Sequence, residues 1–244
     1  MKKSLGPGNG LEQSVFADNL LLAPLSAKAL GRLPFEKIEM KAGEILCRSQ
    51  YPIDHAYFPL SGMISLVQTL DDGGTVEVGM IGREGFFGVP LLYCSNSTPV
   101  EALVQGSGSA LRLPSSRFMA EVAKNDVLRS LLLRYSGALY AQTLQTAACN
   151  GRHKVPERLA RWLLEAHDRL ETDDMPLRHE FISYMLGCRR SSVTVGVGAL
   201  RRRGIIEIGR GVVRVKDRRK LEAAACGCYE TVREEFKRLF AKPR

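Results

Sequence analysis

Residues 178–220 read RHEFISYMLGCRRSSVTVGVGALRRRGIIEIGRGVVRVKDRRK, and this stretch decides the fold. Residues 178–186 place apolar side chains at helical spacing, and Gly187 then allows the tight turn that joins two helices in a helix-turn-helix unit. A second helix is predicted from about Arg189 to Arg202. Two β-rich segments around Gly209-Arg210-Gly211 follow it and predict a hairpin. The stretch therefore predicts a helix-turn-helix with a wing.

The same stretch also holds the positive charge of the chain. Twelve of its residues are Lys or Arg and three are acidic, so its formal charge is +9, equal to that of the whole chain of 244 residues. A positive field concentrated on such a scaffold is typical of proteins that bind the phosphate backbone of DNA. A solvated charged face without a ligand is the alternative, but it does not explain why the charge coincides with the helical spacing and the turns.

The N-terminal end of the second helix enters the major groove in this motif. Arginine at that end can pair with guanine, and Ser or Thr can reach bases or phosphates. The predicted DNA contacts are Arg178, His179, Arg189, Arg190, Ser191, Ser192, Thr194, Arg201 and Arg210. Two alternatives remain open. The two serines could serve only to cap the helix, and Arg201, Arg202 and Arg203 could serve only to complement the dipole at the helix C-terminus.

Between Phe35 and Leu113, short segments rich in β-forming residues alternate with glycines. Many short strands with glycine turns at this spacing predict an antiparallel sandwich or roll. Asp72-Gly73-Gly74 is a suitable hairpin turn, since glycine supplies the positive φ that such turns need. With the leucine-rich helical lead-in over residues 11–33, the predicted N-terminal sensor domain spans residues 1–114.

Residues 115–151 contain few glycines and carry a nearly continuous apolar stripe at helical spacing. A helix or helix pair this long and this apolar on one side needs a partner surface. The partner could be the preceding roll or the same helix of a second subunit. We predict a dimerisation helix over residues 115–151, with Leu128, Leu132, Tyr135 and Leu139 as its seam.

The bulk composition is that of a soluble globular protein, with 25% charged and 45% apolar residues. The chain starts without a signal peptide and has no apolar run long enough to span a membrane, so we predict a cytoplasmic protein. Its six cysteines lack C-x-x-C spacing and are expected to be free thiols. Cys226-Gly-Cys228 alone is too sparse to predict a metal site. We expect no metal and no cofactor.

Three segments of the sequence resemble the CRP/FNR family of bacterial transcription regulators: residues 57–62 (YFPLSG), 79–86 (GMIGREGF) and 186–194 (LGCRRSSVT), the last being the most diagnostic. The resemblance extends from about Leu20 to Tyr229. It implies an α+β chain with an N-terminal antiparallel jelly roll of the cyclic-nucleotide-binding type, a long dimerisation helix and a C-terminal winged helix-turn-helix over residues 152–244. It also implies a homodimer on a two-fold operator.

The chain departs from this family in the segment that would hold a cyclic nucleotide. Members that bind one place an arginine on the phosphate, whereas residues 95–102 (SNSTPVEA) hold no cation. Glu84 could stand for the ribose-binding glutamate. The residues that the resemblance places around an effector are Gly82, Arg83, Glu84, Gly85, Ser97 and Thr98. We expect an unidentified small-molecule effector rather than a cyclic nucleotide.

Two other classes of function compete with a DNA-binding regulator. The sequence shows no nucleophile–His–acid constellation, Walker loop or metal cluster, so we predict that the chain is not an enzyme. An interaction module without DNA binding does not explain the basic winged helix. The predicted partners are double-stranded DNA, a second copy of the chain, the effector and RNA polymerase.

Overall fold

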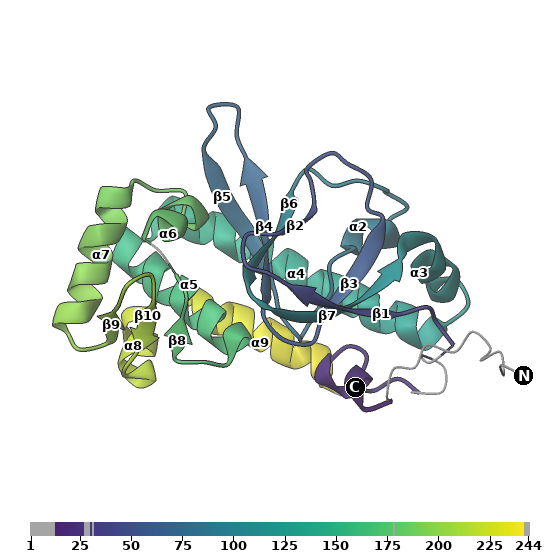
Figure 1. Ribbon diagram of the computed structural model, residues 1–244. Helices are drawn as coiled ribbons and strands as arrows, with labels where there is room; N and C mark the ends of the chain where they lie inside the picture. Colours follow the sequence, from purple (N-terminus) through teal and green to yellow (C-terminus); the bar gives the residue numbers. More distant parts are fainter. Residues whose placement is uncertain (1–12, 27–29, 31, 178, 242–244) are drawn as a thin grey trace, which may run out of the picture.

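The computed structural model describes residues 13–26, 30, 32–177 and 179–241 (Figure 1). A β roll occupies the middle of the molecule, and a helical unit with a small three-stranded sheet lies at one end. The long helix α4 (Asp126–Arg152) passes behind the roll and leads to this helical unit. None of the helices in these ranges is both long and apolar enough to cross a lipid bilayer.

Two antiparallel sheets form the roll, with the strand orders β1-β7-β3 and β2-β6-β4-β5. The strands are β1 (Glu36–Met40), β2 (Ile45–Cys47), β3 (His55–Pro59), β4 (Met63–Thr69), β5 (Thr75–Ile81), β6 (Glu101–Gly106) and β7 (Gly108–Pro114), with the short helices η1 (Gln13–Asp18) before them and α2 (Val89–Leu92) between β5 and β6. The hairpin between β4 and β5 turns at the predicted glycines, and Gly73 has a φ of +78°. The predicted antiparallel roll is confirmed.

Aromatic side chains join the roll to the helices that follow it. Phe58 on β3 stacks on Phe86 with their ring centroids 5.3 Å apart. Phe118 on α3 (Ser115–Val122) lies 5.5 Å from the same ring, and Tyr135 on α4 lies 5.3 Å from it. All four side chains are almost completely buried. The helical region is therefore part of the core of the roll, because its side chains complete that core.

The region predicted as a dimerisation helix or helix pair consists of two helices, α3 and α4. The helix is interrupted at residues 123–125. The Asn125 side chain accepts a hydrogen bond from the Leu128 amide at 3.0 Å. This contact satisfies one of the amides that a helix start leaves without a partner. Helix α4 is 27 residues long, which corresponds to about 40 Å at 1.5 Å per residue.

The predicted dimer seam lies on the inner face of α4. Leu128, Leu132, Tyr135 and Leu139 are only 0–7% exposed in the single chain, and they pack into the core of the roll. Side chains that are already buried within one subunit have no surface to offer to a second one. The prediction of these four residues as the seam is therefore wrong.

The C-terminal unit is a winged helix-turn-helix. Its elements are α5 (Val155–Leu170), β8 (Asp174–Met175), α6 (His179–Met185), α7 (Arg190–Arg202), β9 (Ile206–Ile208), β10 (Val213–Val215) and α8 (Arg218–Ala224). Gly187 turns the chain between α6 and α7 with a φ of +55°. Gly196 explains one oddity of the sequence, because a Cβ there would lie 3.2 Å from Leu159 of α5. The glycine thus lets α7 approach α5 closely.

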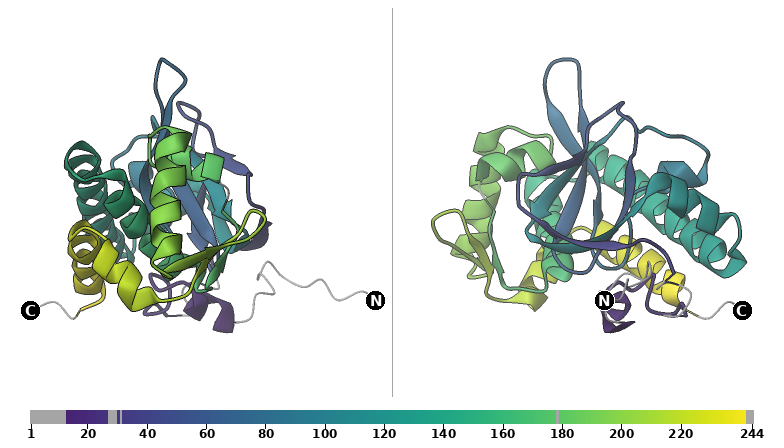
Figure 2. Two further views of the ribbon diagram at one scale, coloured as in Figure 1. Left: turned by 90° about the vertical axis from the view of Figure 1, so that its left-hand side faces the viewer. Right: turned by 45° about the vertical axis from the view of Figure 1, so that its right-hand side comes forward.

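A last helix, α9 (Cys228–Phe240), lies beyond the wing and folds back along α4. Both views in Figure 2 show α9 beside α4, below the roll. Leu239 of α9 is buried in the core of the roll, and Arg134 of α4 donates hydrogen bonds to backbone carbonyls at the end of α9. The C-terminal helix therefore connects the winged helix to the roll.

Candidate DNA interface and effector pocket

Helix α7 presents a continuous exposed face. Its inner side is buried through Val193, Val197 and Leu200, as the sequence predicted. Arg190 and Thr194 are exposed on the other side, one helical turn apart, and the Thr194 hydroxyl donates a hydrogen bond to the Arg190 carbonyl at 3.0 Å. Ser191, Val195 and Arg201 are also exposed on this helix, whereas Ser192 is half-buried.

Val195 is 66% exposed, an unusual position for a large aliphatic side chain. An apolar side chain on a recognition helix can contact the methyl group of thymine, which only A·T pairs present in the major groove. The exposed face of α7 thus combines cations, hydroxyls and one apolar side chain, the three kinds of group that read base edges.

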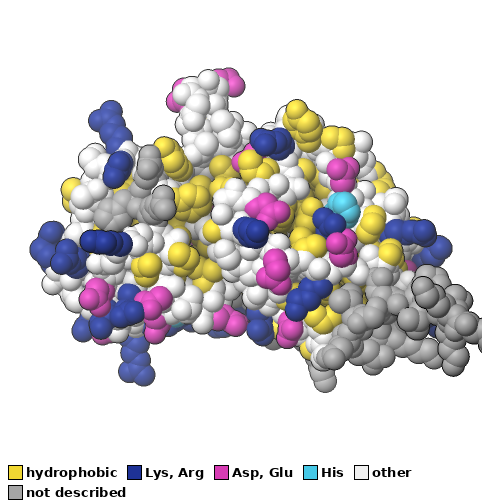
Figure 3. Space-filling view, in the orientation of Figure 1, with side chains coloured by type: hydrophobic (Ala, Val, Ile, Leu, Met, Phe, Trp, Pro, Cys, Tyr) yellow, Lys and Arg dark blue, Asp and Glu magenta, His cyan; other side chains and the backbone are white. Residues whose placement is uncertain are grey.

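Some basic residues of the winged helix form salt bridges with acidic residues of the described chain, and others do not. Within the described ranges, the predicted contacts Arg189, Arg190, Arg201 and Arg210 form no salt bridge. Several other cations of the winged helix are paired, as in Arg214–Asp174, Lys216–Glu207 and Arg218–Asp168. Figure 3 shows Lys and Arg side chains on the end of the molecule that carries α7 and the wing. Cations without an internal partner remain available to phosphate groups.

The remaining predicted contacts lie around α7. Arg189 is the N-cap residue of α7 and is exposed, and Arg210 lies at the tip of the wing between β9 and β10. His179 is the first residue of α6. Arg178 falls outside the described residues. The structure therefore brings Arg189, Arg190, Ser191 and Thr194 together at one end of α7, with Arg201 at the other end.

Glu84 forms an ion pair with Arg169, a residue of the winged helix. Its carboxylate Oε1 accepts hydrogen bonds from Arg169 Nε of α5 at 2.8 Å and from the Gly82 amide at 3.1 Å. The Glu84 and Arg169 side chains are only 14% and 7% exposed. A buried ion pair is broken only at a large cost, because one charge would remain buried without its partner. Glu84 is therefore an interdomain contact rather than a free acceptor for a ribose.

The glycines beside Glu84 are required by packing. A Cβ at Gly82 would lie 2.8 Å from Arg169 Cγ, and one at Gly85 would lie 2.4 Å or less from ring atoms of Tyr135. No side chain fits at either position. The Gly82–Gly85 turn of the roll thus fits closely against α5 and α4, which explains why this segment is rich in glycine.

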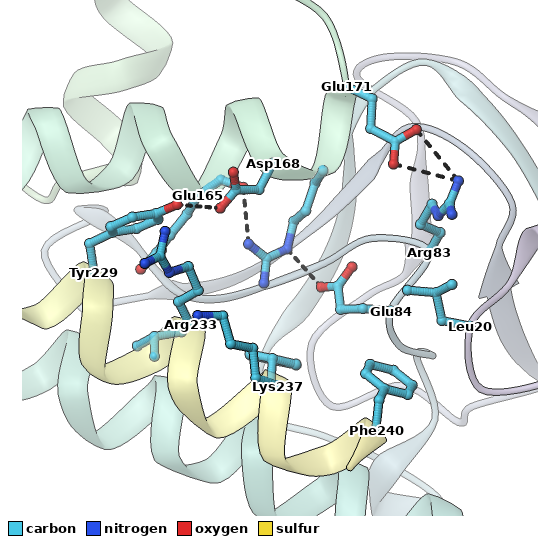
Figure 4. Close-up of a pocket in the computed structure, with 13 residues that line it drawn as sticks. Leu20, Arg83, Glu84, Glu165, Asp168, Glu171, Tyr229, Arg233, Lys237 and Phe240 are labelled. Carbon is cyan, nitrogen blue, oxygen red and sulfur yellow. Dashed lines mark hydrogen bonds and ion pairs between the residues drawn. The ribbon is translucent and has the colours of Figure 1, made fainter. Parts of the chain in front are cut away.

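A pocket of about 290 Å³ lies where the roll, α5 and α9 meet (Figure 4). Arg83 and Glu84 line it from the roll, and Tyr229 and Arg233 line it from α9. Arg83 reaches Glu171 at 3.5 Å, at the mouth of the pocket. Charged side chains from three elements therefore surround this pocket, and several of them are paired with one another.

The interior of the roll holds a separate, smaller cavity of about 150 Å³. Its lining residues are Leu66, Ile81, Phe86, Phe87, Gly88, Val89, Pro90, Thr98, Val100 and Leu139. Thr98 is the polar side chain among them, and its hydroxyl accepts a hydrogen bond from the Val100 amide at 3.3 Å. Among these described lining residues there is no Lys or Arg to hold a phosphate.

The effector residues predicted from the sequence do not form one site. Arg83 and Glu84 line the interdomain pocket, whereas Thr98 lines the cavity in the roll. Gly82, Gly85 and Ser97 line neither of these two spaces. The prediction of a single pocket is therefore wrong, because α5 and α9 cover the segment around Glu84.

Sequence reasoning missed a buried polar network between the roll and α5. Glu77 of β5 accepts hydrogen bonds from Trp162 Nε1 at 2.9 Å and from the Ser65 hydroxyl at 2.5 Å. Burial raises the pKa of Glu77 to about 8. Arg161, the residue before Trp162 on α5, pairs with Glu165 one helical turn later at 2.9 Å, and this contact is almost fully buried. Trp162, the single tryptophan of the chain, is the one sequence feature that pointed to this network. Its partner Glu77 lies 85 residues away, so the contact could not be predicted from the sequence.

Two domain families match the chain, one in its N-terminal part and one in its C-terminal part. Residues 37–125 match the cyclic nucleotide-binding domain, and residues 157–224 match the Crp-like helix-turn-helix domain. Together the two matches cover more than half of the chain, and solved structures of the same fold include members of the CRP/FNR family. The chain belongs to the CRP/FNR family of transcription regulators. It is a CRP/FNR-type regulator with a helix-turn-helix DNA-binding domain.

Individual CRP/FNR relatives are distant. The chain is 24% identical to the transcriptional regulator SdrP of Thermus thermophilus over 198 residues, which is 78% of this chain and 94% of the relative. It is 25% identical to the global nitrogen regulator of a Nostoc species over 167 residues, or 64% and 74% of the two chains. The structure of FixK2 from Bradyrhizobium japonicum superimposes with a TM-score of 0.68 at 19% identity and covers 80% of this chain and 98% of that one. This likeness shows the fold.

The CRP/FNR-type chain has a second apolar face on α4, opposite the buried one. Leu133, Tyr140 and Leu144 are 43%, 65% and 52% exposed. A Cβ at Gly137 would meet nothing within 4 Å, so this position is open as well. The spacing of these four residues is 4, 3 and 4, which is the heptad spacing of helices that pair with one another. The sequence stripe through Leu144 contained this signal, but it could not be separated from the inner face.

A second group of residues that the sequence did not connect lies outside the regions matched by the two families. Cys149, His153, Cys226 and Cys228 place one ligand atom each within 4.8 Å of the others. The expectation of no metal site rested on the spacing of Cys226 and Cys228 alone. The fold adds Cys149 and His153, which are more than 70 positions earlier in the chain.

Proposed function

We propose that this CRP/FNR-type regulator binds a two-fold DNA site as a homodimer and places one α7 helix in the major groove of each half-site. The exposed face of α7 carries the proposal, because its predicted reading residues are exposed and its arginines have no internal ion-pair partner in the described chain. Arg190 is assigned to guanine, which arginine contacts through O6 and N7. Val195 is assigned to a thymine methyl group.

The other predicted contacts are assigned to the DNA backbone. Arg189 and the half-buried Ser192 lie at the start of α7, where a helix N-terminus favours a phosphate. Arg201 and Arg210 are exposed at the end of α7 and at the tip of the wing. Phosphate contacts set the position of the protein on DNA, whereas base contacts select the sequence. His179, the first residue of α6, and Arg178, which lies outside the described residues, remain predicted DNA contacts.

The outer face of α4 is proposed as the dimer seam in place of the buried one. It consists of Leu133, Gly137, Tyr140, Leu144, Ala147 and Gly151, all exposed and all at heptad spacing. Glycine and alanine at three of these six positions allow two helices to approach closely. The heptad spacing supports pairing over about five turns of α4.

The roll is proposed to sense a small molecule other than a cyclic nucleotide. Its cavity of about 150 Å³ is below the usual range of about 300–1,000 Å³ for ligand sites, and its lining is apolar. A cyclic nucleotide would bring a phosphate that has no cation to pair with there. The proposed domains are the sensor over residues 1–114, the dimerisation region over 115–151 and the DNA-binding domain over 152–244.

The family is one of transcription regulators, which are not enzymes, and we propose no catalytic role. A regulator of this type acts where its DNA lies, so we place it in the cytoplasm. RNA polymerase is the protein partner that such a regulator would contact at a promoter. The surface for that contact is not assigned to particular residues.

A salt titration of DNA binding tests the proposal. If each subunit neutralises about 4–6 phosphates, log K should fall with log[salt] at a slope of roughly −7 to −11 per dimer. Fluorescence anisotropy with an operator selected from random sequences measures this slope. A slope near zero would contradict phosphate contact, and a slope of half this size with a single bound chain would contradict the dimer.

A further inference from the structure

Four potential metal ligands converge where α4 ends and α9 begins. Cys149 lies in the last turn of α4, and His153 is the residue that caps the C-terminus of this helix. Cys226 lies in the loop after α8, and Cys228 is the first residue of α9. The backbone amide of His153 donates to the Cys149 carbonyl at 3.0 Å, so one turn of helix holds both residues on one side. Two segments far apart in the sequence thus supply two ligands each.

The distances between the ligand atoms suit a single ion. Cys149 Sγ lies 3.5 Å from Cys226 Sγ, and Cys228 Sγ lies 3.4 Å from His153 Nδ1. In a tetrahedral zinc site with Zn–S bonds of about 2.3 Å, neighbouring sulfurs are about 3.8 Å apart. The observed separations, all within 4.8 Å, are close to this value. Side chains that only filled the core would not need to direct four ligand atoms at one point.

We propose that Cys149, His153, Cys226 and Cys228 bind one Zn²⁺ ion in a tetrahedral Cys₃His site. Three thiolates and one imidazole are a ligand set of structural zinc sites, in which the protein supplies all four ligands. An iron–sulfur cluster fits less well, because its cysteines bind different irons and must stand further apart. A disulfide between Cys149 and Cys226 would use two of the four residues and leave His153 and Cys228 unexplained.

The surroundings of the four residues resemble those of a closed metal site. Cys149 and Cys228 are buried, and His153 and Cys226 are half-buried. The Gln145 side-chain amide, one turn before Cys149, donates a hydrogen bond to Cys228 Sγ at 3.0 Å. Hydrogen bonds of this kind orient ligands and disperse the charge of a thiolate. Gln145 therefore supplies a polar partner to one of the four proposed ligands.

The proposed site would fasten the C-terminal helix at the junction of the two domains. His153 lies between α4 and α5, where the long helix joins the winged helix. With Cys226 and Cys228 bound to the same ion, the start of α9 is fixed to this junction. The other end of α9 is held by Arg134. The ion would thus add a cross-link to a contact that spans the domain boundary.

The first test measures metal in the full-length protein, purified under reducing conditions. Elemental analysis should find about one zinc ion per chain, and cobalt substitution should give the visible absorption of a tetrahedral thiolate site. Cys226→Ser combined with Cys228→Ser should lose more than about 90% of the bound metal, since two of the four ligands are gone. Cys94→Ser is the matched control, because Cys94 is an exposed cysteine outside the group.

Four outcomes of this test would overturn the proposal. They are reduced protein that takes up neither zinc nor cobalt, a double serine variant that keeps its metal, a loss of metal in the Cys94→Ser control, and iron with the spectrum of a cluster. If the double serine variant fails to fold, the wild-type protein still tests the proposal. In that protein, a strong chelator should lower Tm by several degrees and added Zn²⁺ should restore it. An unchanged Tm after complete removal of zinc would contradict a structural ion.

A second variant tests the histidine without destroying the site. His153→Cys would give four thiolates, so the cobalt form should keep its metal and show thiolate charge-transfer absorption higher by about one third. A purely structural role of His153 in capping α4 would not change this absorption. Equal absorption in the variant and the wild-type protein would overturn the assignment of His153 as a ligand.

Discussion

Two faces of helix α4 carry apolar residues at the same heptad spacing, yet one face is buried and the other is exposed. The inner face, which includes Leu132 and Leu139, packs into the roll and also lines its cavity. The outer face, with Leu133 and Leu144, has no partner within the described part of the chain. Heptad spacing thus identifies the apolar faces of a helix, but it does not say which face packs within the same chain.

The largest expected effect comes from the inner face. Leu132→Asp would bury an unpaired carboxylate in the core, so we expect a loss of more than about 4 kcal/mol in the free energy of unfolding and little folded protein. Circular dichroism and urea denaturation measure this loss. Leu133→Asp is the matched control on the neighbouring residue, and it should keep its helical signal and a cooperative transition. Similar unfolding of both variants would break the comparison between the two faces.

The next effect concerns the outer face. Leu133→Asp combined with Leu144→Asp would place like charges across the proposed seam, so the protein should fold but remain a monomer. Specific DNA affinity should then fall by about 100-fold or more, because two half-sites no longer act together. Analytical ultracentrifugation and anisotropy measure the two changes. A dimer that persists in this variant would move the interface to another surface.

A smaller effect is expected from the reading face of α7. Arg190→Ala should cost about 1–3 kcal/mol per half-site on the preferred operator and relax the preference at one base pair. Binding to a panel of operators with single base changes measures both quantities. Arg210→Ala is the comparison, since a wing contact to phosphate should weaken all sequences alike. If Arg190→Ala weakened binding equally on every operator, Arg190 would contact the DNA backbone rather than a base.

No effect is expected from cyclic nucleotides. If the inner face of α4 closes the roll with an apolar wall, cyclic AMP and cyclic GMP should show no saturable binding at micromolar concentrations. Isothermal titration calorimetry tests this, with operator affinity measured in the presence of each nucleotide. A micromolar dissociation constant would show that the cavity opens to a charged ligand. Loss of that affinity in Arg83→Ala would instead place the phosphate in the interdomain pocket, which Arg83 lines.

The parts of the fold with local signals could be predicted from the amino-acid sequence. The turn at Gly187, the spacing of Val193, Val197 and Leu200, and the glycine-flanked Arg210 predicted the winged helix, because each depends on residues within a few positions. The β-rich segments and the charge of residues 178–220 were equally local. These features are confirmed as the fold and as the exposed basic surface.

Which distant residues meet became clear from the folded chain alone. It buried Leu128, Leu132, Tyr135 and Leu139 against the roll, paired Glu84 with Arg169, and brought Cys149 and His153 to Cys226 and Cys228. Each of these contacts joins residues separated by tens of positions or depends on which side of a helix faces the core. Periodicity along a chain carries no information about either, because the partner surface is set by how the domains pack.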